Sequence, residues 1–206
     1  MWFQALSMKI FGVGEFASRF PNAIAGLITL LLLYSFGKRI YNHRFGLLWV
    51  AAYFGSILPH LYFRSGIIDP WFNLFIFLGI YHLILFHWKK EHQKGIELPK
   101  NKFFYLILAG VFTGLGILVK GPVALLITLL TLAAYWFYAK LKFYINVWEL
   151  GMYLVAVLLT SAVWFALVTL MYGPQFFIEF TRRQWELFAN QDAGHGGFIG
   201  YHFVVL

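Results

Sequence analysis

The sequence predicts an all-α fold: a multispan transmembrane helical bundle of about six spans plus an interfacial N-terminal helix. Of the 206 residues, 61% are hydrophobic and only 12% are charged, and the apolar residues fall in long blocks. A soluble domain of this size keeps a large share of its residues on the surface, so it has no place for so much apolar surface. Continuous apolar runs such as 24–36 fit helices, because barrel strands would alternate polar and apolar residues.

The N-terminal segment, residues 1–19, is too polar to cross a membrane. Its apolar residues recur at helical spacing, which predicts a short helix in the membrane interface. An ordinary helix packed on the bundle is the alternative. The apolar face consists of Trp2, Phe3, Leu6, Ile10 and Phe11. Gly12 and Gly14 interrupt this helix, and Pro21 suits the first turn of the first span.

The apolar blocks that follow predict the positions of the spans. They lie at about 20–37, 45–63, 71–88, 103–119, 122–139 and 148–171. Lys120-Gly-Pro122 alone separates the fourth span from the fifth, which indicates a tight reversal, with one long kinked helix as the alternative. Gly110 and Gly114 predict close packing of two helices. Residues 1–206 are expected to form a single transmembrane domain, with an extracytoplasmic loop over 172–206.

The basic residues predict the orientation of the chain in the membrane. The net charge of +8 is not taken as a sign of a nucleic-acid partner, because the basic residues form short clusters between apolar blocks. The loops after the first, third and fifth spans hold Lys38, Arg39, Arg44, Lys89, Lys90, Lys94, Lys100, Lys102, Lys140 and Lys142. The opposite face holds fewer, so the positive-inside rule places these loops in the cytoplasm and both ends of the chain outside.

Asp69 is the most informative polar residue. It lies between two spans on the predicted outer face, in a stretch otherwise free of acidic residues between Glu15 and Glu91. A carboxylate at the membrane boundary is costly unless it is solvated, paired or functional. One interpretation is a helix N-cap before Pro70, paired with Arg64. The other, compatible with it, is a catalytic carboxylate that binds or activates an acceptor amine or hydroxyl.

Lys120 is the second candidate, as the single charge between Lys102 and Lys140. A lysine at a span end extends to the interface at little cost, which is the structural interpretation. The functional interpretation is that its ammonium holds a lipid phosphate at the outer boundary. Lys120 is therefore a candidate substrate-binding residue, and Arg64 is another.

The C-terminal segment carries the remaining candidates. Arg182 and Arg183 can bind phosphate through forked donors, with Arg183 the preferred ligand, or they can pair with Glu179 or Glu186 on one helix face. His195, three residues after Asp192, is a candidate ligand of a divalent metal or part of an acid/base pair. No cofactor other than this possible metal ion is expected.

Four stretches resemble the multispan glycosyltransferases of the ArnT and protein O-mannosyltransferase type, the GT-C class, and they occur in family order. They are Trp2-Phe-Gln-Ala-Leu-Ser-Met-Lys-Ile-Phe-Gly12 with Glu15 and Arg19-Phe-Pro21, then Ile68-Asp-Pro70, Leu118-Val-Lys-Gly-Pro122 and Asp192-Ala-Gly-His195. The resemblance implies transfer of a sugar from a polyprenyl-phosphate donor to lipid A, protein or another extracytoplasmic acceptor, in contact with membrane lipid. It also implies a bacterial inner membrane.

The resemblance also carries over to individual residues. It implies that Asp69 is an acidic residue of the outer active-site cavity and that Lys120 lies near that cavity. His195 corresponds to a loop histidine that helps to hold a metal in ArnT-like members. The family's principal catalytic acid would precede Met1, and both ends look cut from a longer chain, so the piece alone is expected to be inactive.

Two other classes of function compete with a sugar transferase. A transporter or flippase would place charges near the middle of its spans, whereas here they cluster at span ends. A non-catalytic membrane scaffold is the third hypothesis. The chain has no cysteine, which excludes disulfides, thiolate metal sites and cysteine nucleophiles.

Overall fold

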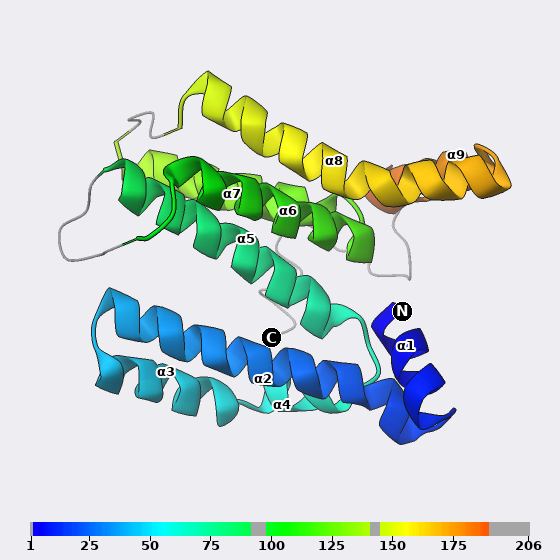
Figure 1. Ribbon diagram of the computed structural model, residues 1–206, viewed down its shortest axis with the longest axis horizontal. Coiled ribbons are helices and arrows are strands. Elements are labelled where there is room, and N and C mark those ends of the chain that lie inside the picture. The colour runs from blue at the N-terminus through cyan, green and yellow to red at the C-terminus, as the bar shows by residue number, and fades with distance from the viewer. Residues whose placement is uncertain (1, 92–97, 141–144, 190–206) are drawn as a thin grey trace. The chain divides into compact units, whose positions relative to one another are not determined.

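The computed structural model describes residues 2–91, 98–140 and 145–189, and within these ranges every regular element is a helix (Figure 1). The helices are α1 Trp2–Phe11, α2 Glu15–Ile40, α3 His43–Phe54, α4 Ile57–Arg64, α5 Asp69–Lys90, α6 Lys102–Lys120, α7 Val123–Tyr138, α8 Val147–Tyr172 and α9 Gln175–Ala189. The all-α prediction is therefore confirmed. The chain divides into two compact units, Met1–Ser161 and Ala162–Leu206. The expectation of a single transmembrane domain stays a prediction.

Four of the described helices, α2, α5, α6 and α8, are long and apolar enough to cross a membrane. A fifth span results if α3 and α4, which meet at a 68° bend, count as one. Helix α7 is apolar but has only 16 residues. The protein is a multi-pass membrane protein, and its six predicted spans correspond to α2, the α3–α4 pair, α5, α6, α7 and α8. The exact number of spans stays a prediction.

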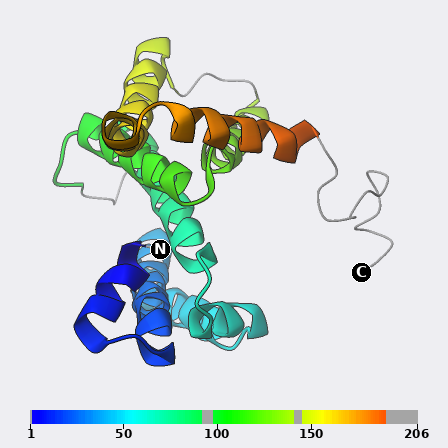
Figure 2. The same ribbon diagram turned by 90° about the vertical axis from the view of Figure 1, so that its right-hand side faces the viewer.

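The break predicted at Gly12 and Gly14 lies between α1 and α2, and Gly12 adopts a φ of +81° there. Helix α2 begins at Glu15, so Pro21 lies inside the helix. The prediction that Pro21 belongs to the first turn of this span is therefore wrong. The reason is that hydropathy marks where a chain becomes apolar, not where its helix begins. Helix α1 packs against the start of α2 (Figures 1 and 2), and its Gln4 side chain reaches Ser18 O. The predicted apolar face, which includes Trp2 and Ile10, stays exposed, so a position of α1 in the membrane interface stays a prediction.

The second predicted span, 45–63, is two helices instead of one. Helix α3 ends at Phe54, Gly55 and Ser56 follow, and α4 contains Pro59 in its first turn. A proline at this position has no N–H for the carbonyl of Gly55, so a continuous helix would lose a hydrogen bond there and clash with the ring. The chain therefore bends at Gly55 and Ser56.

The core of the first unit lies where α5, α6 and α8 meet. Phe86, Leu106 and Tyr153 are buried there. A Cβ on Gly110 would come within 2.6 Å of Ala156 Cβ, and one on Gly114 within 2.9 Å of Val157 O. The two glycines therefore let α6 approach the backbone of α8, which confirms the interpretation of the glycine pair as packing.

Helix α7 folds back along α6. Gly121, with φ +82°, ends α6, and a Cβ on Gly116 would lie 2.9 Å from Ala124 Cβ on α7. The far end of α7 reaches the far end of α5, where Tyr135 Oη and His87 Nε2 are 3.0 Å apart. The tight reversal at Lys120-Gly-Pro122 is confirmed, and the single kinked helix is excluded.

Candidate functional site

The structure brings Asp69 and Lys120 together although 51 positions separate them in the sequence. Asp69 is the first residue of α5, and Lys120 is the last residue of α6. Lys120 Nζ donates to Asp69 Oδ1 at 2.5 Å. The side chain of Asp69 is 28% exposed and that of Lys120 is 35% exposed, so the pair remains accessible.

The local sequence explains how each of these side chains is held. Pro70 has a fixed φ that suits the first turn of α5, and the cap position is Ile68, with no side-chain hydrogen bond to the helix amides. The predicted capping role of Asp69 is therefore wrong, because its carboxylate turns to Lys120 and not to the backbone. Lys120 precedes the positive-φ Gly121, and its ammonium lies 5.3 Å from the Phe72 ring. This contact orients the lysine over α5.

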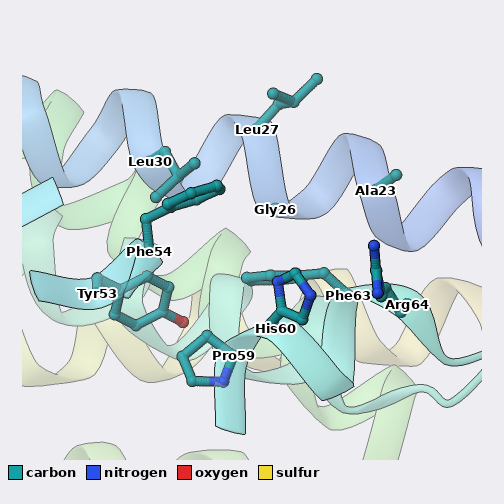
Figure 3. A pocket seen from close by; sticks show the side chains of 10 residues that line it. All are labelled: Ala23, Gly26, Leu27, Leu30, Tyr53, Phe54, Pro59, His60, Phe63 and Arg64. Carbon is teal, nitrogen blue, oxygen red and sulfur yellow. The ribbon is translucent and has the colours of Figure 1, made fainter. Parts of the chain in front are cut away.

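Arg64 lies apart from this pair. Within the described residues the ion-pair partner of Asp69 is Lys120, so the expected pairing with Arg64 is absent. Arg64 lines a pocket of about 340 Å³ between α2 and the bent α3–α4 pair, and Figure 3 shows its side chain directed toward α2 near Ala23. The other lining residues are Gly26, Leu27, Leu30, Tyr53, Phe54, Pro59, His60 and Phe63.

The C-terminal candidates belong to the second unit. Residues 175–189 form α9 within the predicted loop 172–206, and Arg182 Nε lies 3.6 Å from Glu186 Oε1. Arg183 Nη1 is 4.0 Å from the other oxygen of Glu186, so the pairing alternative is the one observed. His195 and Asp192 lie outside the described residues. Among the residues that are described, no three histidine, aspartate or glutamate side chains gather closely enough to hold a metal.

Sequence reasoning missed a second charged cluster at the opposite ends of α5 and α6. Glu149, at the start of α8, accepts from Lys90 Nζ at 2.6 Å, from Lys102 Nζ at 3.0 Å and from Asn146 N at 2.9 Å. Its side chain is only 4% exposed. The available signal was a lone acid at the start of an apolar block, beside loops rich in lysine.

Known proteins resemble this chain over most of its length. Undecaprenyl phosphate-alpha-4-amino-4-deoxy-L-arabinose arabinosyl transferases from Wigglesworthia glossinidia brevipalpis and Aeromonas hydrophila subsp. hydrophila are each 24% identical over 68% of this chain. The crystal structure of ArnT from Cupriavidus metallidurans bound to undecaprenyl phosphate superposes with a TM-score of 0.74 over 99% of the chain, at 19% identity. That likeness establishes the fold. The chain spans 24% of the length of the two relatives and 36% of the ArnT chain.

The family assignment comes from a match between this chain and a model of the sequences of one protein family. That model, of the dolichyl-phosphate-mannose-protein mannosyltransferases, covers residues 1–166. The match includes both Asp69 and Lys120, and it includes Glu149 at the opposite helix ends. On this match the chain belongs to the dolichyl-phosphate-mannose-protein mannosyltransferase family.

Proposed function

We propose that this chain is part of a membrane glycosyltransferase that moves a sugar from a polyprenyl-phosphate donor to lipid A, a protein or another acceptor. The transfer would take place at the extracytoplasmic face of a bacterial inner membrane. The observation that carries the proposal is the accessible Asp69–Lys120 pair at one end of the helices. Membership of the family and the activities for which the relatives are named support the reaction class and the donor.

The pair suits displacement at an anomeric carbon. The bond from that carbon to the phosphate oxygen breaks, a bond to the acceptor oxygen or nitrogen forms, and the acceptor loses a proton. Asp69 supplies a carboxylate that accepts this proton or its hydrogen bond. Lys120 supplies positive charge for the departing phosphate.

Both groups keep capacity for substrate while they are paired. An ammonium has three donors, and one of those of Lys120 is directed at Asp69 Oδ1. A carboxylate accepts at both oxygens, and within the described residues Lys120 is the sole partner of Asp69. A donor phosphate and an acceptor hydroxyl can therefore bind side by side. Arg64, Arg183 and a metal at His195 do not enter this proposal, because the pair does not require them.

The test compares two substitutions in the gene product that carries these residues, assayed in membranes for sugar transfer from a polyprenyl-phosphate sugar. Asp69→Asn removes the base but keeps the side-chain shape, and it should lower turnover about 100-fold or more. Lys120→Ala removes a charged contact to phosphate and should weaken apparent donor affinity about tenfold.

Glu91→Gln is the matched control, because Glu91 is an exposed acid at the other end of α5. It should leave transfer within about twofold of the parent, since an exposed surface charge contributes little. Unchanged turnover in Asp69→Asn, with the protein present in normal amount, would overturn the proposal.

A further inference from the structure

The segment that leads into Asp69 lacks the regular backbone hydrogen bonds of a helix or a sheet. Residues 65–68 connect α4 to α5 without regular structure. Backbone carbonyls away from water need donors, and a connection of this kind obtains them from side chains or solvent. Ile68 O accepts from Phe72 N as the first bond of α5. The three preceding carbonyls, those of Ser65, Gly66 and Ile67, need other partners.

Two side-chain carboxamides provide them. Asn22 Nδ2, on α2, donates to Ser65 O and to Ile67 O, each at 2.7 Å. Gln4 Nε2, on α1, donates to Gly66 O at 2.6 Å and also reaches Ser18 O at 3.3 Å. Three successive carbonyls are therefore held alternately from two different helices, immediately before the carboxylate that pairs with Lys120.

Asn22 is unusual in its position. It is 1% exposed, near the start of a helix apolar enough to span a membrane. A buried carboxamide is costly unless its donors are used, and both of its hydrogen bonds go to this one segment. Removing it would take the side-chain donors away from the partly buried carbonyls of Ser65 and Ile67, so the segment would lose two hydrogen bonds.

Helix α1 holds the other side of Asp69 as well. The ring of Phe3 stacks on that of Trp71, with centroids 4.1 Å apart. Phe3 and Gln4 are adjacent on α1, and they contact residues on either side of Asp69. The segment from Ser65 to Trp71 is thus fixed at both ends by groups that do not touch the Asp69–Lys120 pair.

We infer that Asn22 and Gln4 are positioning residues, whose carboxamides hold the 65–67 segment so that the Asp69 carboxylate stays aligned with Lys120. This inference rests on the proposed function for its catalytic consequence. The geometric part stands separately, because it concerns only where the segment is held. The two parts can therefore be tested by different measurements.

The geometric test uses a cysteine reporter, since residues 1–206 contain no cysteine and any cysteine elsewhere in the gene product is replaced by serine beforehand. A single Ile68→Cys reporter lies beside Asp69 and is partly exposed, so a water-soluble methanethiosulfonate reagent labels it at a rate set by the segment's mobility. Asn22→Leu keeps the branched side-chain shape but removes both donors, and it should raise the labelling rate about tenfold. Gln4→Met, at a less buried position, should raise it about threefold.

Thr29→Val is the control, because Thr29 is a buried polar residue on the same helix whose hydroxyl donates to Ala25 O within α2. It should leave the labelling rate unchanged. An unchanged rate in both Asn22→Leu and Gln4→Met would overturn the inference, and so would an equal rise in Thr29→Val. Because Gln4 is not in a span, its variant keeps the test decisive if Asn22→Leu fails to accumulate.

The catalytic test measures sugar transfer in the same variants. Asn22→Leu should lower turnover about tenfold with little change in apparent donor affinity, and it should cause no further loss when combined with Asp69→Asn. Losses that multiply in the double variant would overturn a role through Asp69. If Asp69→Asn alone leaves transfer intact, the proposed function fails, while the labelling rates still decide whether the segment is held by Asn22 and Gln4.

Discussion

Each end of the α5–α6 pair carries an ion pair between a carboxylate and lysine, but one of these ion pairs is accessible and the other is buried. At one end Asp69 meets Lys120, with both side chains partly exposed and one hydrogen bond between them. At the other end Glu149 is almost fully buried and accepts from two lysines and a backbone N–H. Among the described residues, the first carboxylate accepts one hydrogen bond and the second accepts three.

The difference in exposure suggests different roles: Asp69 is available to a substrate, whereas Glu149 holds helices together. Glu149 links α8 to Lys90 on α5 and to Lys102 on α6, so three helices depend on one carboxylate. A buried ion pair that loses one partner leaves an uncompensated charge, whereas an exposed pair adds little stability. The Glu149 cluster should therefore affect stability, and the Asp69–Lys120 pair should affect activity.

The largest expected effect on stability comes from Glu149→Gln. It removes the charge of the buried carboxylate that Lys90 and Lys102 share, and it should lower the free energy of unfolding by about 3 kcal/mol. Both lysines keep some exposure, 18% and 32%, which keeps the loss at the low end for a broken buried pair. Denaturant unfolding in mild detergent measures it.

Asp69→Asn is the matched comparison at the other end, since it removes the same charge from an accessible pair. It should change the free energy of unfolding by less than about 1 kcal/mol. Equal losses at the two ends would contradict the division between a structural and a functional carboxylate.

A smaller loss of stability is expected from a substitution where α6 and α8 approach each other. This close approach lies between the two helices that carry Lys102 and Glu149. Gly110→Ala places a Cβ 2.8 Å from Tyr153 O, a backbone atom that cannot rotate away. We expect a loss of about 2 kcal/mol in the free energy of unfolding, from the same detergent measurement.

Gly151→Ala on α8 is the control, because nothing lies within 4 Å of its added Cβ. Alanine is the better helix former there, so this substitution should be neutral or stabilise by up to about 1 kcal/mol. If Gly110→Ala were equally harmless, close approach would not be what holds α6 against α8.

The sequence was sufficient for features that depend on local composition. Apolar blocks identified α2 and α5 to α8, Gly110 and Gly114 indicated a packed face, and Lys120-Gly-Pro122 indicated a reversal. The bend between α3 and α4 was missed even though Gly55, Ser56 and Pro59 are visible in the sequence. Hydropathy averages over a window, so a short break inside an apolar block does not interrupt the predicted span.

Features that depend on distant contacts could not be predicted. Asp69 and Lys120 were singled out separately as rare charges, but nothing in the sequence pairs a residue with one 51 positions away. Asn22 and Glu149 were overlooked because a polar residue inside or beside an apolar block has no periodicity of its own. Their roles appear only once the 65–67 segment and the ends of α5 and α6 are in place.

The smallest expected effect is a difference in stability between variants of the two lysines that pair with Glu149. Lys90 Nζ lies 2.6 Å from the carboxylate and its side chain is 18% exposed, whereas Lys102 Nζ lies at 3.0 Å and is 32% exposed. The more buried and shorter contact should contribute more, because water competes less for it. Lys90→Met should therefore cost about 1 kcal/mol more than Lys102→Met in detergent unfolding. Equal costs would mean that the remaining lysine neutralises Glu149 from either side, so that the cluster needs one positive charge and not a particular lysine.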